Sequence, residues 1–189
     1  MQRQDPRRTI QVCSIQHWVC GALLGLAPPA MAVDEGRLRD ASSTSSDWVT
    51  YGHNYENQRF STLDQVHRGK VGQLEPRWTY HTGIKASFQA SPIVADGMMY
   101  LSTPKNHVVA LDAATGVEKW RYAHEYRPGK LCCGPANRGV SVGYGAVYMA
   151  TADARLIALD AQTGSVLWDV PMAVADTKPT EVGGGSRCG

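Results

Sequence analysis

Two cysteines at adjacent positions are followed closely by an arginine in GKLCCGPANRGVSVG, residues 129–143. Cys132 and Cys133 are a candidate disulfide, and Arg138 carries a planar, permanent charge suited to a carboxylate. A disulfide between neighbours closes almost no chain loop, so it lacks most of the entropic stabilisation of an ordinary disulfide. Its value would be a rigid, flat, polarisable surface. Beside the arginine, such a surface indicates a site for a flat molecule that carries carboxylates.

Other interpretations of the cysteine pair stay open at this point. Cys13 and Cys20 lie in the amino-terminal segment described below, which leaves Cys188 as the third cysteine of the remaining chain. In an oxidising compartment the adjacent pair is a candidate to bond with itself. The two residues could also be free thiols, or one of them could pair with Cys188.

The cysteines lie between two copies of a repeat. SPIVADGMMYLSTPKNHVVALDAATGVEKWRYA, from Ser91, aligns without a gap with GVSVGYGAVYMATADARLIALDAQTGSVLWDVP, from Gly139, at an offset of 48 residues. Each copy holds four short runs rich in Val, Ile, Tyr and Met, separated by turn residues, which predicts four strands per copy. In the ALDAATG and ALDAQTG turns, the Asp and Thr can bond to the backbone and the Gly can take positive φ.

A four-stranded antiparallel unit repeated every 48 residues is typical of a β-propeller blade, so we expect an all-β protein. A parallel β-helix is the alternative architecture. A weaker copy, LEPRWTYHTG, places Trp78 ahead of Trp120 and Trp168, and we expect the three rings to pack between neighbouring blades. Four blades need about 190 residues, more than the 157 that follow residue 32. We therefore expect two to three blades of a longer propeller.

The repeat also predicts which polar residues meet. Cys132, Cys133 and Arg138 lie in the connection from the last strand of one blade to the first strand of the next, and Asn137 corresponds to Gln89 at the 48-residue offset. Such connections surround the central channel on one face of a propeller. We therefore expect Gln89, Asn137 and Arg138 to converge at one mouth of the channel.

The two ends of the chain differ from the repeats. Residues 1–32 hold three arginines, a short apolar run and small residues before a cleavage point after Ala32, which predicts a secretory signal peptide. The run is shorter than the roughly 20 residues that span a bilayer. We expect a flexible linker over 33–46, a partial propeller over 47–175 and a divergent tail over 176–189, for which a truncated end and a flexible terminus both stay open.

The composition argues against several kinds of partner. The chain is 43% hydrophobic and 19% charged with a net charge of +2, as in an ordinary globular domain. Its basic residues are scattered, so we expect no nucleic-acid partner, and no membrane span once the signal is removed. The six histidines lack metal-ligand spacing, so the sequence assigns neither a metal ligand nor a catalytic residue to this chain.

Three segments resemble the periplasmic alcohol dehydrogenases that depend on pyrroloquinoline quinone (PQQ). They are DWVTYGHNYENQRFSTLDQV at 47–66, the two ALDA repeats, and CCGPANRGV at 132–140. The resemblance implies an eight-bladed propeller that binds the quinone with a calcium or lanthanide ion and oxidises alcohols to aldehydes. It also implies a periplasmic location and a cytochrome c as electron acceptor.

On the matching positions, the resemblance implies that Cys132 and Cys133 form a disulfide stacked against the quinone and that Arg138 contacts the cofactor. Gln89 stands where many members carry a glutamate, so its contact would lack charge. The family's ion ligands and catalytic aspartate belong to later blades, outside this chain.

Two other functions remain as hypotheses. A non-catalytic propeller that serves as a binding scaffold would share the blade repeat, but it has no use for a strained cysteine pair over its channel. An inactive truncated remnant would carry the same motifs without a function of its own.

Overall fold

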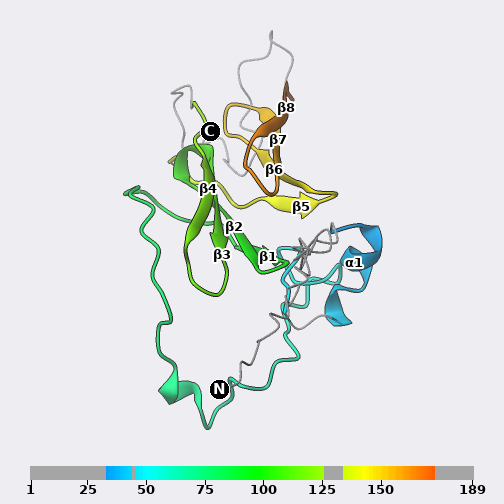
Figure 1. Ribbon diagram of the computed structural model, residues 1–189, viewed down its shortest axis with the longest axis vertical. Helices are drawn as coiled ribbons and strands as arrows, with labels where there is room; N and C mark the ends of the chain where they lie inside the picture. The colour runs from blue at the N-terminus through cyan, green and yellow to red at the C-terminus, as the bar shows by residue number, and fades with distance from the viewer. Residues whose placement is uncertain (1–32, 44–45, 126–133, 173–189) are drawn as a thin grey trace, which may run out of the picture.

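The computed structural model describes residues 33–43, 46–125 and 134–172. In this part of the chain two four-stranded antiparallel sheets form, each with its strands in sequence order (Figure 1). The signal peptide predicted at 1–32, the cysteine pair and the tail predicted at 176–189 lie outside the described residues.

The strands follow the repeat of the sequence. The first sheet consists of β1 (Ile93–Ala95), β2 (Met98–Thr103), β3 (His107–Asp112) and β4 (Glu118–Tyr122). The second consists of β5 (Ser141–Gly143), β6 (Ala146–Ala150), β7 (Arg155–Asp160) and β8 (Val166–Pro171). Each strand of the second sheet starts 48 residues after its counterpart in the first. The predicted all-β unit of four antiparallel strands is therefore confirmed.

Turn chemistry sets where the strands end. Asp96–Gly97, between β1 and β2, has φ values of 53° and 74°, the conformation that an Asp-Gly hairpin favours. Between β3 and β4, Asp112 Oδ1 accepts hydrogen bonds from the Thr115 backbone N–H at 3.0 Å and from its hydroxyl at 2.9 Å. Asp160 accepts the same two bonds from Thr163 in the second sheet. The turn predicted from the repeat is present in both copies.

Tryptophans connect successive units through this turn. The Trp78 ring covers Gly116 so closely that an added Cβ would stand 2.5 Å from it, and its Nε1 donates to a carbonyl of the same turn at 3.2 Å. The Trp120 ring covers Gly164 in the same way, since a Cβ added there would stand 2.5 Å from the ring. Its Nε1 donates to a carbonyl of that turn at 3.0 Å. The predicted packing of these two rings is confirmed, and a glycine is required beneath each because a side chain would collide with the ring.

The third tryptophan has no such partner in the described residues. Trp168 on β8 is 40% exposed, and Val166, Leu167 and Val170 on the same strand are exposed as well. No described sheet covers the face of β8 that carries Trp168 and Val170.

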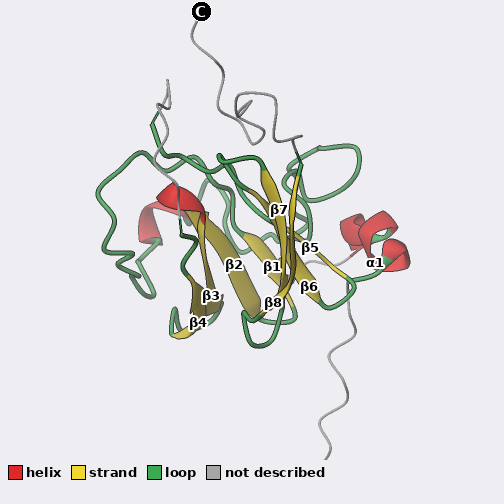
Figure 2. Cartoon of the chain, turned by 90° about the horizontal axis from the view of Figure 1, so that it is seen from above, coloured by secondary structure: helices red, strands yellow, loops and turns green. Residues whose placement is uncertain are grey.

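The core lies between the two sheets, which stand next to each other in Figure 2. Val108 and Ala110 of β3, and Val147 and Ile157 of the second sheet, belong to this core and are fully buried. Tyr100 belongs to the same cluster, and its hydroxyl donates across the boundary to a carbonyl of the second sheet at 3.2 Å. Apolar burial therefore joins the two blades into one packed unit.

The segment expected to be a linker makes specific contacts. It contains the helix α1 (Glu35–Arg39) and the 3₁₀ turn η1 (Ala41–Ser43); two further 3₁₀ turns are η2 (Val71–Gln73) and η3 (Pro104–Asn106). Val33 is buried, and its carbonyl accepts from the Tyr144 N–H at 2.8 Å. Arg37 donates to both carboxylate oxygens of Asp96 at 2.8 and 2.9 Å. Single anchoring residues, without a periodic pattern, thus hold part of this segment against the sheets, and the linker predicted over 33–46 stays a prediction.

No helix in the described ranges is long and apolar enough to cross a membrane.

Candidate functional site

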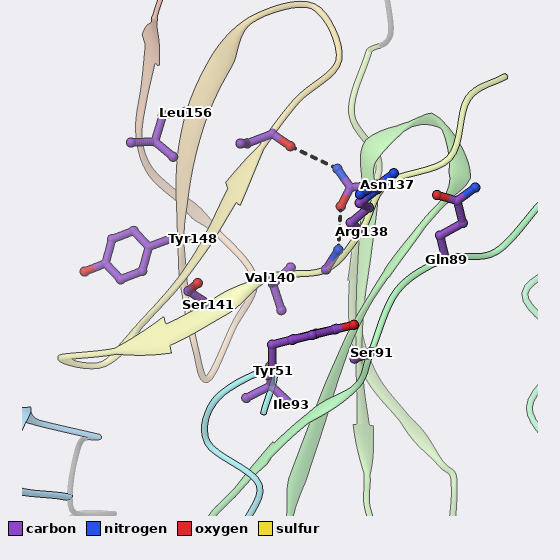
Figure 3. A pocket seen from close by; sticks show the side chains of 12 residues that line it. Tyr51, Gln89, Ser91, Ile93, Asn137, Arg138, Val140, Ser141, Tyr148 and Leu156 are labelled. Atoms are coloured by element: carbon purple, nitrogen blue, oxygen red, sulfur yellow. Dashed lines mark hydrogen bonds between the residues drawn. The ribbon is translucent and has the colours of Figure 1, made fainter. Parts of the chain in front are cut away.

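A cavity of about 720 Å³ lies where the two blades begin, and the first strands β1 and β5 contribute to its wall. Gln89, Asn137 and Arg138 all line it (Figure 3). Gln89 precedes β1, and the other two precede β5, so these residues come from equivalent connections of successive blades. The three residues thus line one cavity, and both its identity as a mouth of the central channel and their role in binding a cofactor stay predictions.

Asn137 anchors the connection that carries Arg138. Its side chain is 4% exposed, and its Nδ2 donates to Asn106 Oδ1 at 3.0 Å and to the Ala150 carbonyl at 2.9 Å. Its Oδ1 accepts from the Gly139 N–H at 3.0 Å. Figure 3 shows the bonds to Ala150 and Gly139 as dashed lines. The side chain therefore ties this connection to both sheets, while Arg138 is exposed beside the cavity.

The turn η3 supports the same connection from the first sheet. The Lys105 N–H donates to the Pro135 carbonyl at 2.8 Å. Asn106 is 1% exposed and has a φ of 60°, a left-handed conformation that asparagine adopts more readily than most residues. Its Oδ1 accepts a second hydrogen bond from the Ala152 N–H at 3.3 Å. Asn106 therefore links the first sheet, the second sheet and Asn137.

One wall of the cavity is a packing surface. Tyr148 and Leu156 of the second sheet form part of this wall. Tyr148 corresponds in the repeat to Tyr100, which packs in the core at the boundary between the sheets. The polar end of the cavity, formed by Gln89, Asn137 and Arg138, is thus the candidate site. The volume of the whole cavity does not indicate the size of a ligand.

Tyr51 also lines the cavity, and the repeat did not predict it. Trp48 forms an isolated antiparallel bridge with Val94 of β1, so the chain before Tyr51 runs along the edge of the first sheet. The guanidinium carbon of Arg59 stands 4.5 Å from the centre of the Tyr51 ring. The signal in the sequence was the segment 47–66, which carries the family resemblance but has no counterpart in the repeat.

A group of titratable side chains lies at the boundary between the blades, away from the cavity. His124 Nε2 lies 3.0 Å from Asp153 Oδ1, and the His124 backbone N–H donates to His107 Nδ1 at 2.9 Å. Burial lowers the pKa of His107, and positive neighbours lower it further. For Asp153, burial raises the pKa, but hydrogen bonds from Thr151 and His124 outweigh it, so the pKa falls below its usual value.

The polar end of the cavity fits a ligand that carries carboxylates. The guanidinium of Arg138 can bind a carboxylate through two parallel hydrogen bonds, and the Gln89 amide can donate one more. The described ranges hold no group of three or more His, Cys, Asp or Glu that could bind a metal ion. The residues present therefore suit an organic anion such as PQQ, whose carboxylates such donors would bind, without supplying an ion site.

Two four-stranded blades with a polar cavity at the start of their first strands define the class of protein as a partial β-propeller. Residues 48–177 match the family model "PQQ: Glucose/ethanol/alcohol dehydrogenase, beta-propeller domain". The chain belongs to this family, as the resemblance predicted.

Individual relatives agree with this assignment. The chain is 39% identical over 130 residues to the quinohemoprotein alcohol dehydrogenase ADH-IIG of Pseudomonas putida, covering 64% of this chain and 18% of that protein. It is 36% identical over 129 residues to subunit 1 of the cytochrome c methanol dehydrogenase of Methylorubrum extorquens, covering 64% of this chain and 20% of that protein. The structure of the quinohemoprotein alcohol dehydrogenase from Comamonas testosteroni matches with a TM-score of 0.74 and 35% identity, covering 78% of this chain and 22% of that one. The chain thus spans about a fifth of the length of the curated relatives it matches.

Proposed function

We propose that this chain supplies amino-terminal blades of a periplasmic quinoprotein that oxidises alcohols to aldehydes with PQQ. The observation that carries the proposal is the position of Arg138 and Gln89 at the polar end of a cavity between two blades. Membership of the PQQ dehydrogenase family supports it. The relatives named above are alcohol and methanol dehydrogenases.

Each residue has a defined part in this proposal. Arg138 binds a carboxylate of the cofactor, and Gln89 donates a neutral hydrogen bond. Cys132 and Cys133, which lie outside the described residues, form the disulfide against the flat face of the ring, as the family resemblance implies. When bound, the quinone accepts the two electrons and two protons that leave the alcohol.

Other components belong to parts of the protein beyond this chain. A calcium or lanthanide ion and its ligands, together with a catalytic aspartate, would come from further blades. The electron acceptor would be a cytochrome c, in keeping with the name of the methanol dehydrogenase relative. Export by the signal peptide at 1–32 would deliver the chain to the periplasm.

The test is a titration of the full chain, labelled with ¹⁵N, with PQQ alone. We expect saturable shifts of the Arg138 side-chain Nε–H resonance and of the Gln89 and Gly139 amides. Arg138→Ala should raise the dissociation constant about 2- to 5-fold, the range for an exposed ion pair.

Arg68→Ala is the matched control, because Arg68 is an exposed arginine that does not line the cavity. It should leave the dissociation constant unchanged. A titration without saturable shifts at Arg138 would contradict the proposal and would favour the scaffold hypothesis.

A further inference from the structure

We infer that Asn137 is a positioning residue for Arg138, whose buried amide sets the direction in which the guanidinium meets its ligand. The inference rests on the proposed cofactor site and deepens it. It concerns residues of the described chain only.

The side chain of Arg138 does little to fix its own direction. Arg138 is exposed, and no hydrogen bond or ion pair holds its guanidinium among the described residues. A long, exposed side chain loses rotamer freedom when it binds a ligand. The direction of its Cα–Cβ bond therefore has to come from the backbone around it.

Asn137 fixes this backbone on both sides of Arg138. The hydrogen bond from the Gly139 N–H to Asn137 Oδ1 joins the two residues that flank the arginine, at 3.0 Å. Asn137 is itself buried, so this small turn cannot rotate freely. Gly139 has a φ of 139°, which glycine adopts without strain, and this allows the chain to turn directly after the arginine.

This turn is anchored to two rigid elements. The Asn137 Nδ2 donors reach Asn106, at the end of η3, and the carbonyl of Ala150, at the end of β6. These are contacts to both sheets, so the frame that orients Arg138 is the packed core between the blades. Loss of the Asn137 amide would leave buried acceptors at Asn106 and Ala150 with one bond fewer.

A double-mutant cycle separates positioning from simple support of the fold. The full chain and the variants Asn137→Ala, Arg138→Ala and the double variant are titrated with PQQ alone and followed by the Gln89 and Gly139 amide resonances, which all four proteins have. We expect Asn137→Ala to weaken binding about 2- to 5-fold, as Arg138→Ala does. The double variant should bind no more weakly than Arg138→Ala, because Asn137 acts only through the arginine.

Two results would overturn the inference while leaving the proposed site intact. One is an unchanged dissociation constant for Asn137→Ala. The other is independent losses that multiply, so that the double variant is weakened by the product of the two single losses, about 4- to 25-fold. If Arg138→Ala itself has no effect, the proposed function fails first, so the two failures are distinguishable.

Two further variants keep the test decisive. Val109→Ala removes buried apolar volume from β3, away from the cavity. It should lower the melting temperature without changing the dissociation constant, and a change would show that the assay reports stability alone and would overturn the inference. If Asn137→Ala does not fold, Asn106→Ala removes one acceptor of the same amide and should show the same dependence on Arg138, with a loss of about twofold.

Discussion

Two glycines with almost the same backbone conformation have different surroundings. Gly145 has a φ of 78° and Gly164 a φ of 72°. A Cβ at Gly145 would meet nothing within 4 Å, whereas a Cβ at Gly164 would stand 2.5 Å from the Trp120 ring. Substitution at Gly145 thus measures the positive φ alone, and substitution at Gly164 measures the same φ together with the contact to the neighbouring blade.

We expect Gly145→Ala to lower the free energy of unfolding by about 1 to 2 kcal/mol, the cost of a left-handed conformation for a residue with a Cβ. Gly164→Ala should cost about 3 to 4 kcal/mol, because Trp120 must also move out of its packed position. Urea denaturation followed by tryptophan fluorescence measures both. Equal losses in the two variants would show that the ring does not depend on the turn beneath it.

At the level of the strands, the boundary between the two sheets carries a histidine with a lowered pKa. His107, the first residue of β3, is part-buried, and this burial is the main reason that its pKa lies below 6.5. Positive charge on three neighbouring side chains lowers the pKa of His107 further. These side chains are His124, Lys105 and Arg121. The folded protein therefore binds a proton at this position less readily than the unfolded chain does.

This shift predicts that acid weakens the packing of β3. Because the folded pKa is lowered, the stability contributed by His107 is complete above 6.5 and is lost as pH falls through the folded pKa. We expect the free energy of unfolding to decrease between pH 7.5 and pH 5. Protonation of Asp153 changes the stability only below this pH range, because the pKa of Asp153 lies below 3.8.

His107→Asn tests the assignment, since an asparagine oxygen can still accept the hydrogen bond from the His124 N–H. This variant should show a shallower dependence of stability on pH in urea denaturation. His67→Asn, at an exposed histidine, is the control and should keep the original slope. Parallel slopes for the parent chain and His107→Asn would rule out His107 as the group responsible.

In the molecule as a whole, one side of the candidate site and one side of the second sheet have no described partner. The apolar residues along β8 are exposed, and the Tyr148 wall of the cavity corresponds to a surface that is packed in the first sheet. Gln89, Asn137 and Arg138 come from one pair of neighbouring blades. Catalysis by preorganised charges needs donors around the reacting atoms and exclusion of water.

We therefore expect the isolated chain not to oxidise alcohols, even with added PQQ and calcium. A dye-linked oxidation assay with ethanol measures this, and a full-length quinohemoprotein alcohol dehydrogenase serves as the positive control. Turnover above the level without protein would mean that the catalytic groups lie within this chain after all.

Local patterns in the sequence were enough to predict the blades. The four strands of each sheet follow from short β-rich runs with turn residues between them, and the Asp112 and Asp160 turns follow from bonds between residues two or three positions apart. The repeat also brought Gln89 and Arg138 to one cavity, because equivalent positions of successive blades occupy equivalent places. These features depend on local chemistry or on the repeat, and both can be recognised in the sequence alone.

Other features required the packing of the sheets. Asn137 is held by hydrogen bonds to Asn106 and Ala150, which are distant in sequence and belong to the two different sheets. Tyr51 reached the cavity, and Val33 was buried, through contacts outside the repeat. Such contacts are single pairs between distant segments, and no periodicity or motif encodes them. They exist only once the buried surfaces of two sheets have set the distances between those segments.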